Sequence, residues 1–209
     1  MRNDPRLFTI LLAAALTGAA CSGEAETADT AEVAEAAAPA QTAPECRVTA
    51  SAEEVAARPS PLGQVEFAPG GHPARLCYGA PSANGRVVMG GELVPYGSLW
   101  RAGANEPTTF HLTGPANIGG IALEPGAYSM YFEAGPEEWT VFLNTNHERW
   151  GIPISPEVRA SEVGSFTVTP EPMDEMVETL RYHWEPAGDG SMGNIVLEWE
   201  NTRVAIHVM

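Results

Sequence analysis

Alternation of apolar and polar residues in short segments is the sequence feature that most constrains the fold of this chain. In residues 203–208, Val204, Ile206 and Val208 occupy every second position, so their side chains share one face of an extended strand. Other segments of alternating or β-rich composition are separated by Gly, Pro and Asn. They are residues 74–78, 108–112, 127–133, 138–144, 165–169 and 194–200. This pattern predicts half-buried antiparallel strands.

Helical signals are scarce in the same part of the chain. Ser51 with Glu54 three residues later forms a capping-box pattern, and Pro59 would end the short helix that it starts. Residues 173–180 fit a helix as well as a strand, because their apolar residues repeat at helical spacing. Strands and helices do not alternate, so the sequence predicts an all-β fold. We expect an antiparallel β-sandwich or jelly-roll-like body with one short N-terminal helix.

The N-terminus has the layout of an export signal. Arg2 and Arg6 precede an apolar run at residues 7–16, and small residues then lead to Cys21. The run is too short to span a bilayer as a mature helix. A Cys directly after the cleavage site resembles the lipobox of bacterial lipoproteins, in which a lipid is attached to the Cys sulfur. Residues 1–20 are therefore predicted to be a lipoprotein-type signal peptide, and a lipid on Cys21 is predicted to anchor the protein to a membrane.

The stretch between this anchor and the globular part reads as a spacer. Residues 21–45 consist mostly of Ala, Glu, Thr and Pro and contain no basic residue. Such a composition buries too little apolar surface to fold, which predicts a disordered acidic tether, with a transient helix as the alternative. Residues 46–209 have the length of a single β-rich domain. Because Ser22 resembles the outer-membrane sorting signal, the expected location is the cell envelope, as an outer membrane lipoprotein that faces the periplasm or the cell surface.

The charge of the chain excludes several classes of partner and chemistry. The formal net charge is -16, and all 11 basic residues are Arg, so the chain contains no Lys. A P-loop lysine and Schiff-base chemistry are therefore excluded. Without a polybasic strip for phosphate backbones, nucleic acid is not expected as a partner.

The cysteine count predicts one disulfide. Three Cys are present, and Cys46 and Cys77 remain as an even pair if Cys21 carries a lipid. Pairs of Cys in exported proteins are oxidised in most cases, so a bridge between Cys46 and Cys77 is predicted. Two free buried thiols are the alternative.

Residues 81–109 read PSANGRVVMGGELVPYGSLWRAGANEPTT and are dense in residues that recognise ligands. Aromatic faces, an Arg fork, an amide and a carboxylate lie close together there, as binding of a small polar ligand such as a sugar requires. The candidate ligand-binding residues are Arg86, Tyr96, Trp100, Arg101, Asn105 and Glu106. The structural alternative is that Arg101 and Glu106 form an internal ion pair while Trp100 fills the core.

The same segment resembles the signature of a bacterial exported family, domain of unknown function 2911. The likeness centres on Trp-Arg-Ala-Gly-Ala-Asn-Glu at residues 100–106 and covers nearly all of the body from about Arg58 onward. Further matching motifs are residues 125–129, 138–141, 150–151, 197–199 and 202–204. The resemblance implies a β-rich fold and an exported protein. It implies no activity, because the family has none established.

No catalytic set is recognisable in the sequence. His147 and Glu148 begin like a zinc-protease motif, but Gly151 stands where the second His is needed. The His residues are scattered singly, so neither a metal nor a cofactor is predicted. The leading hypothesis is a lipid-anchored, non-enzymatic envelope domain that binds a small polar ligand or a partner protein. Two alternatives remain open: an envelope hydrolase acting on carbohydrate with Glu106 as acid or base, and a purely structural envelope component.

Overall fold

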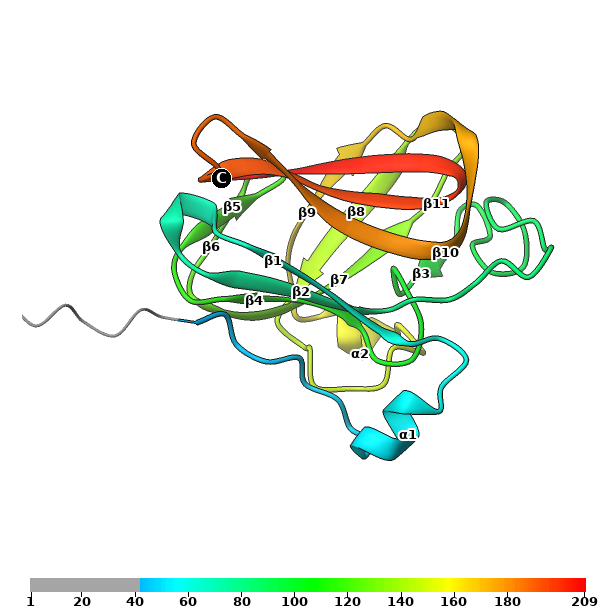
Figure 1. Ribbon diagram of the computed structural model, residues 1–209, viewed down its shortest axis with the longest axis horizontal. Helices are drawn as coiled ribbons and strands as arrows, with labels where there is room; N and C mark the ends of the chain where they lie inside the picture. Colours follow the sequence, from blue (N-terminus) through cyan, green and yellow to red (C-terminus); the bar gives the residue numbers. More distant parts are fainter. Residues whose placement is uncertain (1–41) are drawn as a thin grey trace, which may run out of the picture. The chain divides into compact units, whose positions relative to one another are not determined.

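The computed structural model describes residues 42–209, in which two antiparallel sheets pack face to face (Figure 1). The first sheet has the order β1-β2-β4-β7-β8-β9, with the short β3 paired to β7, and the second has the order β10-β11-β5-β6. The strands are β1 Leu62–Phe67, β2 Ala74–Gly79, β3 Leu99–Trp100, β4 Thr108–Leu112, β5 Ala116–Ile118, β6 Ile121–Leu123, β7 Gly126–Glu133, β8 Trp139–Asn144, β9 Glu162–Val168, β10 Glu171–Ala187 and β11 Met192–Val208. The predicted all-β sandwich is confirmed. The predicted signal peptide, Cys21 and nearly all of the tether lie outside the described residues.

Strand β11 shows how the sequence pattern produces the core. Ile195, Leu197 and Trp199 are buried at odd-numbered positions, whereas the later buried residues, such as Val204, lie at even-numbered ones. The change of face occurs at Glu200, whose φ of 54° is left-handed. One irregular residue moves every following side chain to the opposite face, so both halves of this 17-residue strand point into the sandwich. The ambiguous residues 173–180 are part of strand β10.

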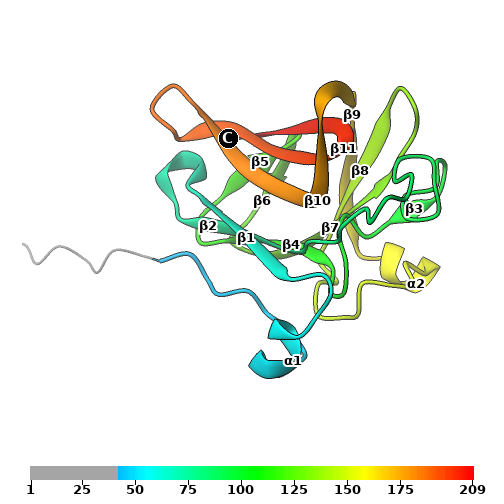
Figure 2. The same ribbon diagram turned by 45° about the vertical axis from the view of Figure 1, so that its right-hand side comes forward.

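The core lies between the two sheets. It includes Leu76 and Phe110 from the first sheet and Ile195 and Leu197 from the second, all fully buried. The opposite face of the first sheet is covered as well. In both views the segment leading to α1 and the loop with α2 (Pro156–Arg159) lie on the side of this sheet away from β10 and β11 (Figures 1 and 2).

A disulfide attaches the covering segment to the first sheet. Cys46 is bridged to Cys77 of β2, with their Cα atoms 5.6 Å apart, which confirms the predicted pair. The segment then enters helix α1 (Ala52–Ala56), where Ser51 and Glu54 form the predicted capping box. No helix among residues 42–209 is both long enough and apolar enough to cross a membrane.

The connection from β2 to β4, residues 80–107, carries the distinctive motif. It contains β3 as its one regular strand and several residues with left-handed backbone, among them Ala102 (φ 60°) and Asn105 (φ 63°). Such conformations cost about 1–2 kcal/mol for a residue with a Cβ and are retained where the surrounding contacts require them. At Ala102 the contacts are clear, since its carbonyl accepts hydrogen bonds from Thr108 and Tyr182 hydroxyls, each at 2.9 Å.

Candidate functional site

The six candidate residues of this connection do not line one common cavity. Trp100 belongs to the core, where its ring stacks on Trp199 with centroids 5.8 Å apart. Asn105 donates from Nδ2 to the backbone carbonyl of Ser60 at 3.0 Å and so fixes the loop. Tyr96 is exposed and lines a separate cavity of about 280 Å³. Asn105 therefore fixes the loop, whereas Trp100 is part of the core and also lines a cavity together with Arg86 and Arg101.

Glu106 forms a clamp on the segment before β1. Arg58 donates to both of its carboxylate oxygens, at 2.7 and 2.9 Å, and the backbone N and hydroxyl of Thr49 donate at 3.3 and 3.2 Å. Burial alone would raise the pKa of Glu106, but these hydrogen bonds outweigh it and lower the pKa. The partner of Glu106 is thus Arg58, not Arg101 as the structural alternative expected. An ionised, fully occupied carboxylate gives no support to a role for Glu106 as a general acid.

Arg86 and Arg101 line a cavity of about 450 Å³, which we call the arginine pocket. The volume is within the range of small-molecule sites. Its walls also contain one carboxylate, that of Glu92. The apolar part of the lining includes Leu93, Leu99, Trp100 and Ile152.

Within residues 42–209, neither guanidinium of the arginine pocket contacts a carboxylate. Arg101 donates from Nε to the carbonyl of Gly103 at 3.2 Å, and burial lowers the pKa of its side chain. Arg86 donates to the carbonyls of Ala83 and Ser82 at 2.8 and 2.9 Å. Backbone carbonyls hold both side chains in place, and no carboxylate of the described part of the chain compensates their positive charge.

Most Arg residues of this acidic protein have a carboxylate partner, so those without one stand out. Of the nine Arg in residues 42–209, six lie within ion-pair distance of a carboxylate. These six are Arg47, Arg58, Arg75, Arg159, Arg181 and Arg203. Two of the remaining three, Arg86 and Arg101, line the same cavity. A cavity with uncompensated cationic donors and apolar walls suits a ligand that carries an anionic group.

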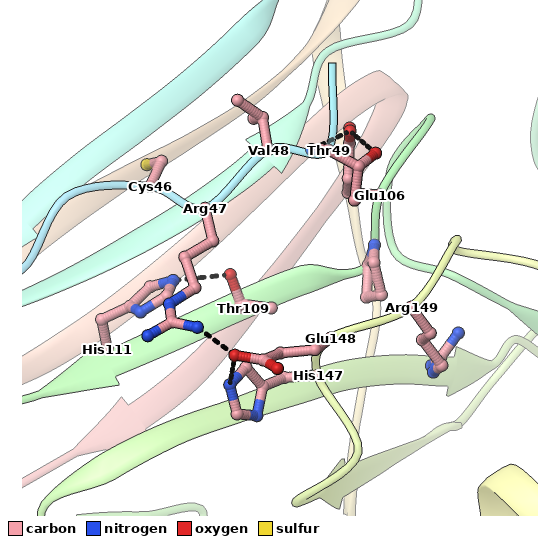
Figure 3. Close-up of a pocket in the computed structure, with 11 residues that line it drawn as sticks. Cys46, Arg47, Val48, Thr49, Glu106, Thr109, His111, His147, Glu148 and Arg149 are labelled. Carbon is pink, nitrogen blue, oxygen red and sulfur yellow. Dashed lines mark hydrogen bonds and ion pairs between the residues drawn. The ribbon is translucent and has the colours of Figure 1, made fainter. Parts of the chain in front are cut away.

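A second cavity of about 480 Å³, the histidine pocket, lies on the outer face of the first sheet (Figure 3). His111 Nε2 is 2.9 Å from the Thr109 hydroxyl, and Arg47 reaches from the covering segment to form an ion pair with Glu148. His147 also lines this cavity. Most of these polar groups have partners within the protein. No group of three or more His, Cys, Asp and Glu in residues 42–209 is placed to hold a metal ion.

The histidine pocket could not be predicted from the sequence. Thr109 and His111 are two residues apart in strand β4, so period-2 alternation already places them on one face, opposite to Phe110. Their neighbour His147 comes from a loop 36 residues further on, between β8 and α2. The sequence holds no signal for that contact.

We expect His111 to make folding stability pH-dependent. Burial first, and then the nearby charges of His147, Arg47 and Arg75, lower its pKa from 6.5 to about 4. The unfolded chain therefore binds more protons between these values, and stability falls as the pH drops from about 6.5 to about 4, with a slope of up to about 1.4 kcal/mol per pH unit. Urea unfolding at a series of pH values measures this slope. His111→Gln should remove it, and an unchanged slope in that variant would contradict the assignment.

The chain matches one known family, and that family has no assigned activity. Residues 60–208 match the family described as "Protein of unknown function (DUF2911)". No curated protein and no solved structure matches the chain significantly. The match extends over both sheets and the whole connection that carries the arginine pocket.

Proposed function

We propose a function for this chain, which belongs to the DUF2911 family of proteins of unknown function: it is a binding domain of the cell envelope that takes up a small anionic ligand in the arginine pocket. The ligand's acidic group would meet Arg101 and Arg86, and an apolar or ring-shaped body would lie against the apolar wall. Sugar acids and aliphatic or aromatic carboxylates are ligands of this kind. The proposal narrows the ligand class from the small polar ligand that the sequence suggests to a small anion.

The observation that carries the proposal is the state of Arg101. Its side chain is partly buried and has no carboxylate partner in the part of the chain that the structure describes. Desolvation of an unpaired cation is unfavourable, and an anion in the cavity would offset it. Hydrogen bonds to charged groups contribute about 1.5–3 kcal/mol, which makes Arg101 the expected main determinant of affinity.

Substitution of Arg101 tests this proposal. The full-length protein is titrated by calorimetry with a panel of small carboxylates, sugar acids, inorganic phosphate and neutral sugars. We expect an anionic member to bind and Arg101→Gln to weaken it by about 10-fold or more, because about 1.4 kcal/mol corresponds to a factor of ten. The matched control is Arg159→Gln, which removes a surface Arg of α2 outside the pocket and should leave affinity unchanged.

Two results would contradict the proposed function. One is that no anion of the panel binds the wild-type protein, which would favour the structural envelope component. The other is that binding occurs but is equally strong in Arg101→Gln and in the wild type.

The proposal also includes attachment to a membrane through Cys21. It rests on the basic, apolar and small residues that precede this Cys, and on Ser22 for an outer-membrane location. We expect the Cys21→Ser variant, expressed in a Gram-negative bacterium, to leave the membrane fraction, and the wild-type protein to have the added mass of a lipid. Wild-type protein that is recovered soluble and without a lipid would contradict this part.

A further inference from the structure

Glu92 is a carboxylate in the same cavity as the two uncompensated arginines. Its side chain is exposed, and in residues 42–209 no basic side chain lies within ion-pair distance of it. The arginine pocket therefore presents charges of both signs, and none of these charges belongs to an ion pair among residues 42–209. A ligand with a single negative charge would compensate Arg101 and be repelled by Glu92.

The loop that carries Glu92 is held firmly in place. Val88 and Val94, on either side of Glu92, are fully buried. The backbone N–H groups of Val88 and Met89 donate to the Glu200 carboxylate of β11 at 3.2 and 3.0 Å. The backbone that carries Glu92 is thus attached to the core on both sides, which reduces the entropy cost of ordering this loop on binding.

The loop is also closed on itself. The N–H of Gly90 donates to the carbonyl of Val94 at 2.9 Å, and that of Gly91 donates to the carbonyl of Val88 at 3.1 Å. A Cβ at Gly91 would lie 2.1 Å from the carbonyl oxygen of Val87, so this position requires Gly. These contacts fix the backbone of the loop from which Glu92 lines the cavity that Arg86 and Arg101 also line.

We propose that the ligand of the arginine pocket is a zwitterion of the amino-acid class, with its carboxylate at Arg101 and its ammonium group at Glu92. Its side chain would contact the apolar wall formed by Leu93, Leu99 and Ile152. This inference rests on the proposed function, because it names the ligand class of the same site. A zwitterion places an opposite charge next to both Arg101 and Glu92, whereas a simple anion is repelled by Glu92 and a simple cation is repelled by the two arginines.

The test uses ligand trios that differ in their charged groups. For leucine, the trio is leucine itself, 4-methylpentanoate, which lacks the ammonium group, and 3-methylbutylamine, which lacks the carboxylate. Equivalent trios are made for alanine and phenylalanine, so that side-chain size is covered. Each compound is titrated into the full-length wild-type protein, Glu92→Gln and Arg101→Gln, with Glu137→Gln of the exposed β7–β8 turn as control.

In at least one trio, we expect the amino acid to bind about 10-fold more tightly than its carboxylate analogue. Glu92→Gln should remove most of that difference by weakening the amino acid about 5- to 10-fold without weakening the carboxylate, and Arg101→Gln should weaken both. Glu137→Gln should bind like the wild type. Near-ultraviolet circular dichroism checks that the variants are folded.

Different results would overturn the zwitterion proposal and the proposed function. If a carboxylate binds as tightly as its amino acid and Glu92→Gln has no effect, the zwitterion is wrong and the anion site stands. If no amino acid binds while another anion does, the zwitterion is likewise wrong and the anion site stands. If no anion or amino acid binds, or if binding is indifferent to Arg101→Gln, the proposed function itself is overturned.

Discussion

Replacement of Trp100 by alanine is expected to lower the free energy of unfolding by about 3–5 kcal/mol. The indole is 7 % exposed and lies between the two sheets, stacked on Trp199 and packed edge-on against Trp139 with centroids 6.3 Å apart. Its removal would leave a cavity that rigid neighbouring rings cannot fill. Chemical unfolding of the variant, followed by circular dichroism, measures the loss.

Trp150→Ala is the matched control for this substitution. Trp150 is 48 % exposed, and the Arg58 guanidinium lies over its ring, 5.9 Å from the centroid. A cation–π contact at an exposed site is worth about 0.5–1 kcal/mol, so this variant should lose about 1 kcal/mol. Similar losses in the two variants would contradict the placement of Trp100 in the core.

Loss of the disulfide should destabilise the domain by a comparable amount. Cys46 and Cys77 are separated by 31 residues in the sequence, and cross-linking a loop of this size contributes about 3.5 kcal/mol in the chain-entropy model. We expect the Cys46→Ser/Cys77→Ser variant to lose about that much in urea unfolding. Reduced wild-type protein should behave like the variant, and a variant as stable as the oxidised wild type would contradict this prediction.

The same variant should loosen the segment that covers the histidine pocket. Without the bridge, Arg47 retains an ion pair in which both side chains are more than half exposed, and such pairs contribute little. Thr49 retains its two hydrogen bonds to Glu106. Amide hydrogen exchange in residues 46–50 should therefore become faster, whereas exchange in the core strand β11 should follow the global stability.

The class of fold could be predicted from the sequence because strand alternation is local information. The alternating residues of 194–200 and 203–208 lie in one strand, and the capping box at Ser51 starts the expected helix. Strand order could not be predicted, since pairing such as that of β11 with β5 joins distant segments. The single irregular residue Glu200, which merges the two segments into one strand, has no signal in the sequence.

The types of residue in the candidate site could be predicted from the sequence, but the ion pairs among them could not. The sequence identified the charged and aromatic residues of the motif, yet Glu106 pairs with Arg58, 48 residues away, and Arg101 has no carboxylate partner in the residues that the structure describes. That distinction depends on how residues 49–60 lie against the motif. Glu92 does not stand out in the sequence, because surface acids are common in this acidic chain; only the cavity that it shares with Arg101 distinguishes it.

The most direct test of the central claim is a crystal structure of the full-length protein with the tightest-binding anionic or zwitterionic ligand from the titrations. We expect a ligand carboxylate about 2.7–2.9 Å from guanidinium nitrogens of Arg101, inside the arginine pocket. A ligand bound in the histidine pocket, or anywhere without contact to Arg101, would contradict it.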